Sequence, residues 1–372
     1  MKSYKFKLYK TKKQRNLHRS VAVAGMIYNH IIALHKRYYN LTGKYISKYI
    51  MAKHIAKMKR HKYPEWKVVG SQAIQNIVFR IDFGFQKFFR KENKRPPTFR
   101  KLCKFKSFTL TQAGWKLGDG YVKIGKQIFK YFNSRKIEGM PKCLHIKRDA
   151  VGDFYIIVVT DFVEIKPNQF KSGKMAGFDF GLKKYLTSSD NNDIECPQFF
   201  KQNIKAIKRV NNYLSSKKKG SKNRSKARKR LARVHRRIKN CRNDWQWKTA
   251  KQLADNYDYL FFEDLDIDGM KKLWGRKVSD LAFSSFMTKL EQQCDKVGTV
   301  IQKIDRWNPS SKTCHICGCL KNDLSLSDRI WTCDHCGIVH DRDRNAAYNI
   351  LTVGASTVGL GDIRPEFPAI AV

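Results

Sequence analysis

The sequence predicts a multidomain α/β protein, and three observations support this prediction. The chain has 372 residues, which is enough for two or three domains with separate cores. Its apolar residues recur with a helical period in some segments and alternate like strands in others. Near the C-terminus, two Cys-x-x-Cys pairs predict a small metal-binding module in addition.

Positive charge dominates the composition. Lys and Arg number 76 against 31 Asp and Glu, a formal net charge of +45. This excess is far larger than solubility requires and predicts a polyanionic partner. No apolar run is long enough to span a membrane, and residues 1–13 lack the apolar core of a signal peptide, so we expect no membrane partner. We expect a cytoplasmic, nucleoid-associated protein whose ten cysteines do not form a secreted disulfide framework.

Residues 1–10 and 99–170 predict an antiparallel β-barrel or sandwich. Tyr4, Phe6 and Leu8 alternate with lysines, which is typical of a half-buried strand with a basic outer face. After residue 99, short apolar runs are separated by glycines, as in all-β units. These runs cover residues 105–110, 121–124, 144–146 and 154–159. We expect the first strand to join this unit, with a helical block inserted between.

Residues 11–98 predict that helical block. Apolar residues recur at helical spacing, and Gly43 marks a break. A further helix follows Ser71, a good N-cap residue, and must end before Pro96. Residues 1–140 contain 34 Lys and Arg but only 5 Asp and Glu. A solvated basic surface is the simpler interpretation, but lysines alternating with aromatic residues favour a nucleic-acid groove.

Residues 201–256 predict a basic helical hairpin. Residues 201–243 contain 18 Lys and Arg and no acid, and two stripes of apolar residues at helical spacing flank a Ser/Lys/Gly turn at 215–221. A disordered basic linker is the alternative, and the two apolar stripes argue against it. We expect the hairpin to rest on a phosphate backbone.

The cysteine pattern is the most specific local signal. Cys314, Cys317, Cys333 and Cys336 form two Cys-x-x-Cys pairs with the spacing of a zinc site, and a glycine follows each pair. Free or disulfide-linked cysteines are the less favoured alternative. Other possible ligands lie close by, so the assignment of the four cysteines rests on their matched positions. These other residues are His315, Cys319, His335 and His340.

Three acids from distant parts of the chain occupy unusual positions. Asp179 lies in an apolar run between two glycines, Glu263 ends another apolar run, and Asp343 precedes a helical segment. An acid within a strand is disfavoured and needs a partner that compensates its burial. A helix cap or a surface carboxylate is the commoner role for each acid alone. Together, the three predict one metal-binding site.

The order of these features resembles the TnpB family. These proteins are RNA-guided DNA nucleases encoded by transposons, have a RuvC-type domain, and are the ancestors of type V CRISPR effectors. The resemblance covers nearly the whole chain. It includes the basic N-terminal elements, the hairpin, and the segments Phe262-Glu263-Asp264-Leu265, Pro309-Ser310-Ser311-Lys312-Thr313-Cys314 and Asp341-Arg342-Asp343-Arg344-Asn345-Ala346-Ala347.

The resemblance implies a role for each acid. Asp179, Glu263 and Asp343 match the catalytic acids of the family, and Asp343 is preferred to Asp341 because it precedes Asn345 by two residues. They would hold two Mg²⁺ or Mn²⁺ ions, while the zinc site would be structural. The implied partners are a guide RNA derived from the transposon end and a double-stranded DNA target. The oligomeric state stays open.

The resemblance also implies a division into domains. A β-barrel wedge domain would comprise residues 1–10 and 99–170, with residues 11–98 as an inserted helical recognition block. An RNase H-like, RuvC-type nuclease domain would comprise residues 174–372. The basic hairpin at 201–256 and a zinc ribbon at 308–340 would be inserted in it.

Two other classes of function are consistent with the same composition. The first is a transposase or DNA-binding accessory protein of an insertion sequence. The second is a guide-dependent regulator that binds DNA without cutting it, and the intact set of three acids argues against this class.

Overall fold

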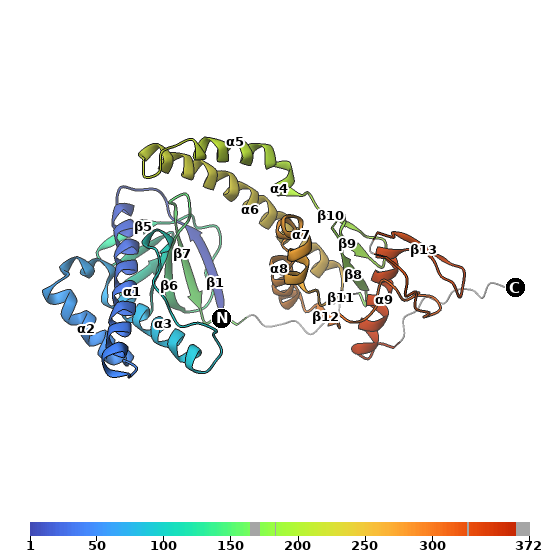
Figure 1. Ribbon diagram of the computed structural model, residues 1–372, viewed down its shortest axis with the longest axis horizontal. Helices are drawn as coiled ribbons and strands as arrows, with labels where there is room; N and C mark the ends of the chain where they lie inside the picture. Colours follow the sequence, from blue (N-terminus) through green and yellow to red (C-terminus); the bar gives the residue numbers. More distant parts are fainter. Residues whose placement is uncertain (164–171, 183, 326, 362–372) are drawn as a thin grey trace. The chain divides into compact units, whose positions relative to one another are not determined.

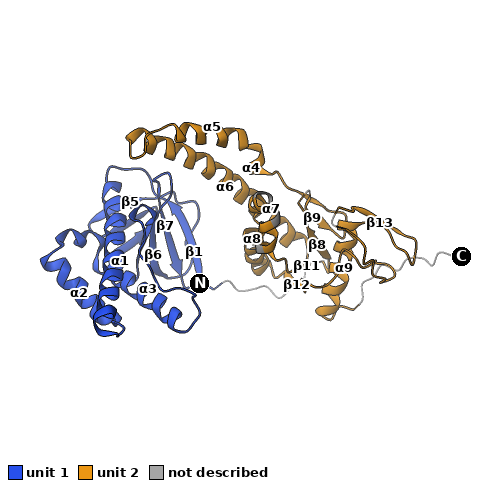
Figure 2. Ribbon diagram, viewed as in Figure 1, with its two compact units in different colours: residues 1–163 blue, residues 164–372 orange. Residues whose placement is uncertain are grey.

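The computed structural model describes residues 1–163, 172–182, 184–325 and 327–361 (Figure 1). The chain separates into two compact units, residues 1–163 and 164–372 (Figure 2). The stretch 164–170 of the predicted barrel and the stretch 362–372 of the predicted nuclease domain lie outside the described residues. None of the described helices is long and apolar enough to cross a membrane.

The strands of the first unit form two antiparallel sheets. The four-stranded sheet has the order β1-β7-β6-β2, so the first strand of the chain pairs with β7 and joins the later strands, as expected. The second sheet has the order β3-β4-β5, and an isolated bridge between Leu8 and Tyr131 links the two. The bounds are β1 (Lys2–Lys7), β2 (Ser107–Leu110), β3 (Trp115–Gly118), β4 (Tyr121–Ile124), β5 (Gln127–Lys130), β6 (Pro141–Arg148) and β7 (Phe154–Thr160).

Helices fill the interval between β1 and β2. They are α1 (Gln14–Thr42), α2 (Lys48–His61), the 3-10 helix η1 (Pro64–Val69), α3 (Ser71–Phe89) and the short η2 (Leu102–Lys104). As predicted, Gly43 ends the first helix, with a φ of 66°. The expectation that Ser71 caps α3 was wrong, because Gly70 occupies the cap with a φ of 80° that other residues rarely adopt. Ser71 instead accepts a hydrogen bond from Lys59.

The core of the first unit lies between these helices and the sheets. Ile27 and Ile31 of α1 and Ile81 of α3 are buried in one cluster with Phe6 of β1 and Ile156 of β7. The helical spacing in 11–98 and the alternation in the strands therefore point their apolar residues into a common interior. The inserted helices and the strands fold as one unit.

The second unit is built on a mixed five-stranded sheet. Its strands are β8 (Met175–Phe180), β9 (Lys184–Ser188), β10 (Ile194–Glu195), β11 (Tyr259–Glu263) and β12 (Val300–Ile304), in the order β10-β9-β8-β11-β12. Strands β8, β9 and β10 are antiparallel neighbours, whereas β11 runs parallel to both β8 and β12. The carboxyl ends of β8, β11 and β12 therefore meet at one edge.

Helices cover both faces of this sheet. On one face α6 (Lys222–Asn256) and α8 (Phe283–Val297) bury an aromatic core that includes Phe178 and Phe262. On the other face α9 (Arg342–Thr357) packs against β8, β11 and β12. The remaining elements are α4 (Phe199–Gln202), α5 (Ile204–Ser215), α7 (Ile267–Leu281) and the strand pair β13 (Ile330–Thr332) and β14 (Val339–Asp341).

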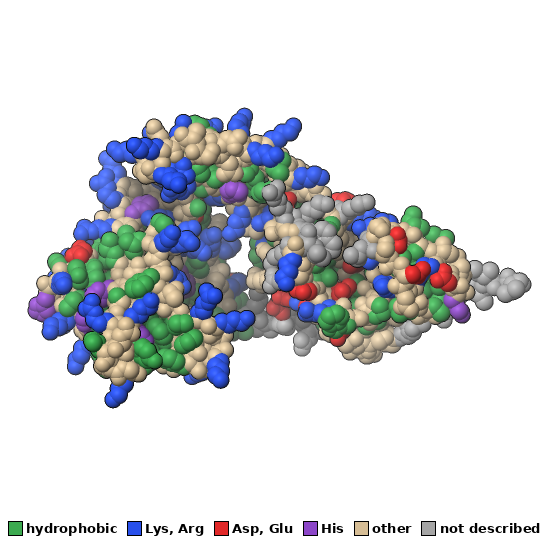
Figure 3. Space-filling model, in the orientation of Figure 1, with side chains coloured by type: hydrophobic (Ala, Val, Ile, Leu, Met, Phe, Trp, Pro, Cys, Tyr) green, Lys and Arg blue, Asp and Glu red, His purple; other side chains and the backbone are tan. Residues whose placement is uncertain are grey.

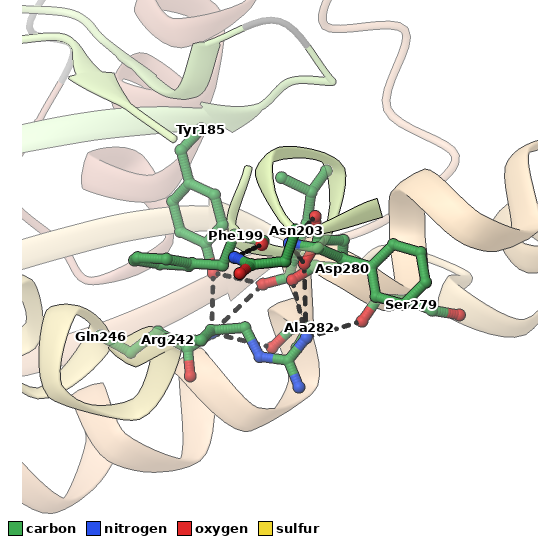
Figure 4. Close-up of polar contacts among 10 residues, drawn as sticks. Tyr185, Phe199, Asn203, Arg242, Gln246, Ser279, Asp280 and Ala282 are labelled. Atoms are coloured by element: carbon green, nitrogen blue, oxygen red, sulfur yellow. Dashed lines mark hydrogen bonds and ion pairs between the residues drawn. The ribbon is translucent and has the colours of Figure 1, made fainter. Parts of the chain in front are cut away.

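The predicted basic hairpin consists of α5 and α6. Ser221 caps α6 by accepting a hydrogen bond from the backbone N–H of Arg224. At the base of the hairpin, Arg242 donates to the carbonyl oxygens of Ser279 and Asp280 at 3.2 and 3.0 Å (Figure 4). Gln246 is fully buried and donates to Leu281 and Ala282, where α7 turns into α8. These bonds attach the hairpin to the core of the second unit.

Candidate functional site

The register of two parallel strands brings Asp179 and Glu263 together. Phe178 of β8 lies opposite Phe262 of β11, so the two acids occupy the next position along each strand. Side chains alternate between the faces of a sheet, and Phe178 and Phe262 lie on the face of α6 and α8. Asp179 and Glu263 therefore lie on the opposite face, the one that α9 covers.

Two glycines let α9 approach this face closely. A Cβ atom at Gly177 would lie 2.2 Å from the carbonyl oxygen of Ala347 and 2.5 Å from the nitrogen of Leu351. A Cβ atom at Gly354 would lie 2.2 Å from the ring of Phe261. Both approaches exclude a larger residue. The first turn of α9 thus lies beside the acidic ends of β8 and β11, a constraint that the sequence analysis missed.

Asp179 lies within electrostatic range of both other predicted acids, Glu263 and Asp343. Burial, together with the nearby carboxylates of Asp343 and Glu263, raises the pKa of Asp179 to about 7, while Arg342 acts in the opposite direction. Burial also raises the pKa of Glu263, opposed by a hydrogen bond from Ser310. A partly buried acid destabilised by like charges is typical of a functional site, and a bound cation would relieve the repulsion.

Asp343 and the two remaining acids near the site each have a partner of their own. Asp343 lies in the first turn of α9 and pairs with Arg329 at 3.1 Å. Asp341 is the N-cap of α9, where its side chain accepts a hydrogen bond from Arg344 N–H at 2.9 Å. Asp264 follows Glu263 and pairs with Arg306 in solvent. Asp341 and Asp264 thus have structural partners of their own.

The four predicted cysteines form a compact cluster. Their sulfur atoms lie within 4.8 Å of one another, with Cys314 3.6 Å from Cys336 and Cys317 3.5 Å from Cys333. These separations are too long for disulfides. They are close to the sulfur spacing of about 3.8 Å that a tetrahedral site with Zn–S bonds of about 2.3 Å requires. The cluster therefore fits one zinc ion.

The competing ligands have separate positions around this cluster. His340 is buried with its Nε2 atom 3.1 Å from the sulfur of Cys314. Burial, assisted by His315, lowers the pKa of His340 to about 4, so its ring is neutral near pH 7. Cys319 and His335 form a second group of three possible ligands with Cys317. Among the described residues, these are the two groups in which three or more possible ligand atoms all lie within 4.8 Å of one another. The carboxylate oxygens of Asp179, Glu263 and Asp343 are therefore spaced more widely.

Comparisons with known proteins match most of the chain. A family model described as "Probable transposase" matches residues 157–273, and one described as "Cas12f1-like, TNB domain" matches residues 283–350. A Streptomyces pristinaespiralis protein named "Putative RNA-guided DNA endonuclease" is 32% identical over 306 residues, which cover 80% of this chain and 75% of that protein. "Putative RNA-guided DNA endonuclease InsQ" of Escherichia coli (strain K12) is 26% identical over 386 residues, which cover 98% and 94%.

A solved structure shares the fold. The protein is Cas12f1, solved in a complex with sgRNA and target DNA. The match has a TM-score of 0.56 at 16% identity and covers 91% of this chain and 83% of that chain. At this identity the likeness shows a common fold.

Proposed function

This chain belongs to the TnpB family, and from that premise we propose that it is a transposon-encoded, RNA-guided DNA endonuclease. The observation that supports cleavage most directly is the convergence of Asp179, Glu263 and Asp343 at one end of the sheet. These acids come from three separate elements, and burial together with mutual repulsion raises the pKa of Asp179 to about 7. Such an arrangement lowers the stability of the fold, and groups with strongly shifted pKa values cluster at functional sites.

The three acids fit one or two Mg²⁺ or Mn²⁺ ions. Carboxylate oxygens are the ligands that these hard cations prefer, and the like charges around Asp179 are what a cation would neutralise. A bound pair of ions would activate a water molecule and stabilise the departing oxygen of a phosphodiester. The chain's own contribution is to hold Asp179 and Glu263 on adjacent strands and Asp343 on the first turn of α9.

The cysteine cluster fits a different metal and a different role. Cys314, Cys317, Cys333 and Cys336 supply four soft ligands and leave no open position for a substrate, as in structural zinc sites. We assign them a structural Zn²⁺ in a zinc ribbon over residues 308–340. In the same proposal, the mixed sheet with α9 is the RuvC-type, RNase H-like core, and the first unit is the wedge domain with its helical insert.

The charge of the chain supports nucleic-acid partners. On the face shown in Figure 3, Lys and Arg side chains are spread over the first unit and over α5 and α6, whereas most of the Asp and Glu side chains lie on the rest of the second unit. The first unit also exposes Tyr9 and Phe132, stacked on each other with ring centroids 3.9 Å apart. Exposed rings among cations can stack on bases. We propose that a guide RNA from the transposon end and a double-stranded DNA target bind here and to the hairpin.

Substitution of the acids tests the proposed cleavage. We expect Asp179→Ala and Glu263→Ala to lose cleavage of a guide-matched plasmid in Mg²⁺, because each removes a metal ligand, while nucleic-acid binding stays nearly unchanged. Asp264→Ala is the matched control, since Asp264 adjoins Glu263 but pairs with Arg306 in solvent. Cleavage by either of the first two variants at the rate of the control would refute the assignment.

Sequencing of bound RNA tests the guide. The Asp179→Ala chain is expressed with the DNA that flanks its gene and washed at high salt, which removes RNA held by charge alone. We expect one discrete RNA that ends in sequence from outside the element. A mixture of ribosomal and transfer RNA fragments would refute guided recognition. Joined products with transposon ends would indicate a transposase, and binding without nicking would indicate a regulator.

A further inference from the structure

A serine from the loop before the cysteine cluster contacts one of the proposed metal-binding acids. The hydroxyl of Ser310 donates a hydrogen bond to Oε2 of Glu263 at 3.3 Å. Ser310 is only 5% exposed. A hydrogen bond from a buried donor limits the orientations that a carboxylate can adopt.

Two asparagines of α9 hold this loop in place. Asn349 donates to the carbonyl oxygens of Ser310 and Thr313 at 2.7 and 2.6 Å. Asn345 donates to the same two oxygens at 3.3 and 2.7 Å. The asparagines are four residues apart, so their amides lie on one face of the helix. Both are largely buried, at 1% and 9% exposure, which makes the loss of these bonds costly.

Asn345 also contacts the segment that carries the cysteine cluster. Oδ1 of Asn345 accepts from the backbone N–H of His315 at 3.0 Å and lies 2.9 Å from its ring Nδ1. His315 follows Cys314 directly in the chain and stacks on Tyr348 of α9 at 4.6 Å. The first Cys-x-x-Cys turn is therefore attached to the helix that carries Asp343.

These contacts form a continuous link between the two sites. Asn345 lies two residues after Asp343 on α9, and the loop that it binds presents Ser310 to Glu263. The distance between Glu263 and Asp343 therefore depends on the loop that contains Ser310 and leads into the cysteine cluster. We propose that Ser310 is a positioning residue for Glu263, and that the metal-loaded cysteine cluster holds Ser310 in place. This inference rests on the proposed function, since it takes Glu263 to be a metal ligand.

The test measures metal affinity apart from cleavage. Mn²⁺ is titrated into the full-length, zinc-loaded chain freed of RNA, and free Mn²⁺ is followed by electron paramagnetic resonance. We expect Ser310→Ala to bind Mn²⁺ roughly tenfold more weakly, the lower end of the effect of removing a residue that orients a metal ligand. The half-maximal Mn²⁺ concentration for cleavage should rise by a similar factor, with less change in the rate at saturating Mn²⁺.

Two further variants separate positioning from general damage. Ser311→Ala alters the neighbouring side chain, which contacts neither Glu263 nor the asparagines through a hydrogen bond, and should bind Mn²⁺ like wild type. Ser310→Thr keeps the hydroxyl and should recover most of the affinity. If Ser310→Ala binds Mn²⁺ as tightly as Ser311→Ala, or if Ser310→Thr is as weak as Ser310→Ala, the inference is wrong.

The zinc arm tests the second half of the inference. The wild-type chain, stripped of zinc and then titrated with Mn²⁺, should also bind Mn²⁺ about tenfold more weakly. An unchanged affinity would refute the proposed support of Ser310 by the cysteine cluster. If Ser310→Ala itself loses zinc, the zinc-free wild-type chain still tests the link, because its Ser310 is intact. Asp179→Ala gives the baseline: if it binds Mn²⁺ like wild type, the proposed function itself fails, whereas a loss there with unchanged Ser310→Ala refutes only the positioning role.

Discussion

The carboxylate site and the cysteine cluster belong to the same unit but are assembled in opposite ways. The cluster is local, since its four ligands come from residues 314–336 and two tight turns present them. The carboxylate site combines β8, β11 and α9 across residues 179–343 and exists only when the helix packs on the sheet. We therefore expect the cluster to need a zinc ion in order to fold, and the three acids to need the packing of α9 on the sheet in order to bind a cation.

Removal of zinc should have the largest effect. Structural zinc sites contribute on the order of 10 kcal/mol to the folding of small modules, and residues 308–340 have few buried apolar residues besides the cysteines. We expect chelation, or Cys333→Ser, to abolish the protection of amide hydrogens in 308–340. Protection in β8 and β11 should persist, because the sheet has its own core. Equal protection of 308–340 with and without zinc would contradict this.

The fold should depend next on Gly177. In Gly177→Ala the new methyl group would lie 2.2 Å from the backbone oxygen of Ala347, and backbone cannot rotate away as a side chain can. We expect the second unit to lose about 3 kcal/mol or more of stability by urea unfolding. Gly275→Ala is the matched control, since its Cβ meets nothing within 4 Å. A stability loss as small as that of the control would show that α9 does not need this close approach.

A substitution at Asp179 should show that the carboxylate site costs stability without metal. Its pKa rises to about 7 in the folded chain, so the folded state binds the proton more tightly than an unfolded chain, where the pKa is about 3.9. Stability therefore falls as pH rises from about 4 to about 7 and stays reduced above that. The rise in pKa alone would correspond to about 4 kcal/mol, and solvent screening of this partly exposed side chain reduces it. Asp179→Asn, which cannot ionise, should therefore be about 2 kcal/mol more stable than wild type at pH 8 in Mg²⁺-free buffer.

The pH dependence supplies the control for that prediction. At pH 5 most of the wild-type Asp179 is protonated, so the difference between the two chains should shrink in urea unfolding. Mg²⁺ should raise the stability of wild type at pH 8 and leave Asp179→Asn largely unchanged. A gap between the two chains that is the same at both pH values would show that the charge of Asp179 is not the cause.

The local cluster could be predicted from the sequence more completely than the carboxylate site. Spacing alone brought together Cys314, Cys317, Cys333 and Cys336, because each pair is one turn of chain. The hairpin helices and the break at Gly43 were also predicted, since periodicity and turn residues are local signals. The three acids were identified as residues, and their roles in catalysis remain predictions.

The close approaches between distant segments could not be predicted. Gly177 of β8 is needed because α9 lies against it, and Gly354 of α9 is needed because Phe261 of β11 lies against it. Nothing in the sequence around either glycine indicates which distant element it contacts. The contact between Ser310 and Glu263 joins residues 47 positions apart. The cap at Gly70 was missed in favour of Ser71 because residue preference is weaker than the backbone conformation that the turn imposes.

The smallest effect should come from Arg329, and its sign should oppose that of Ser310. Arg329 lies between the two Cys-x-x-Cys pairs and pairs with Asp343 at 3.1 Å. Its side chain is half exposed, so the pair contributes less than about 1 kcal/mol to stability. In the metal-free chain, however, the Arg329 guanidinium pairs with the Asp343 carboxylate and would compete with a cation for it. Arg329→Gln should therefore bind Mn²⁺ about two- to threefold more tightly in the paramagnetic resonance titration, a gain worth less than the pair itself. Weaker binding would mean that Arg329, like Ser310, orients its acid for the ion, and that the cysteine-rich module supports the carboxylate site through both contacts.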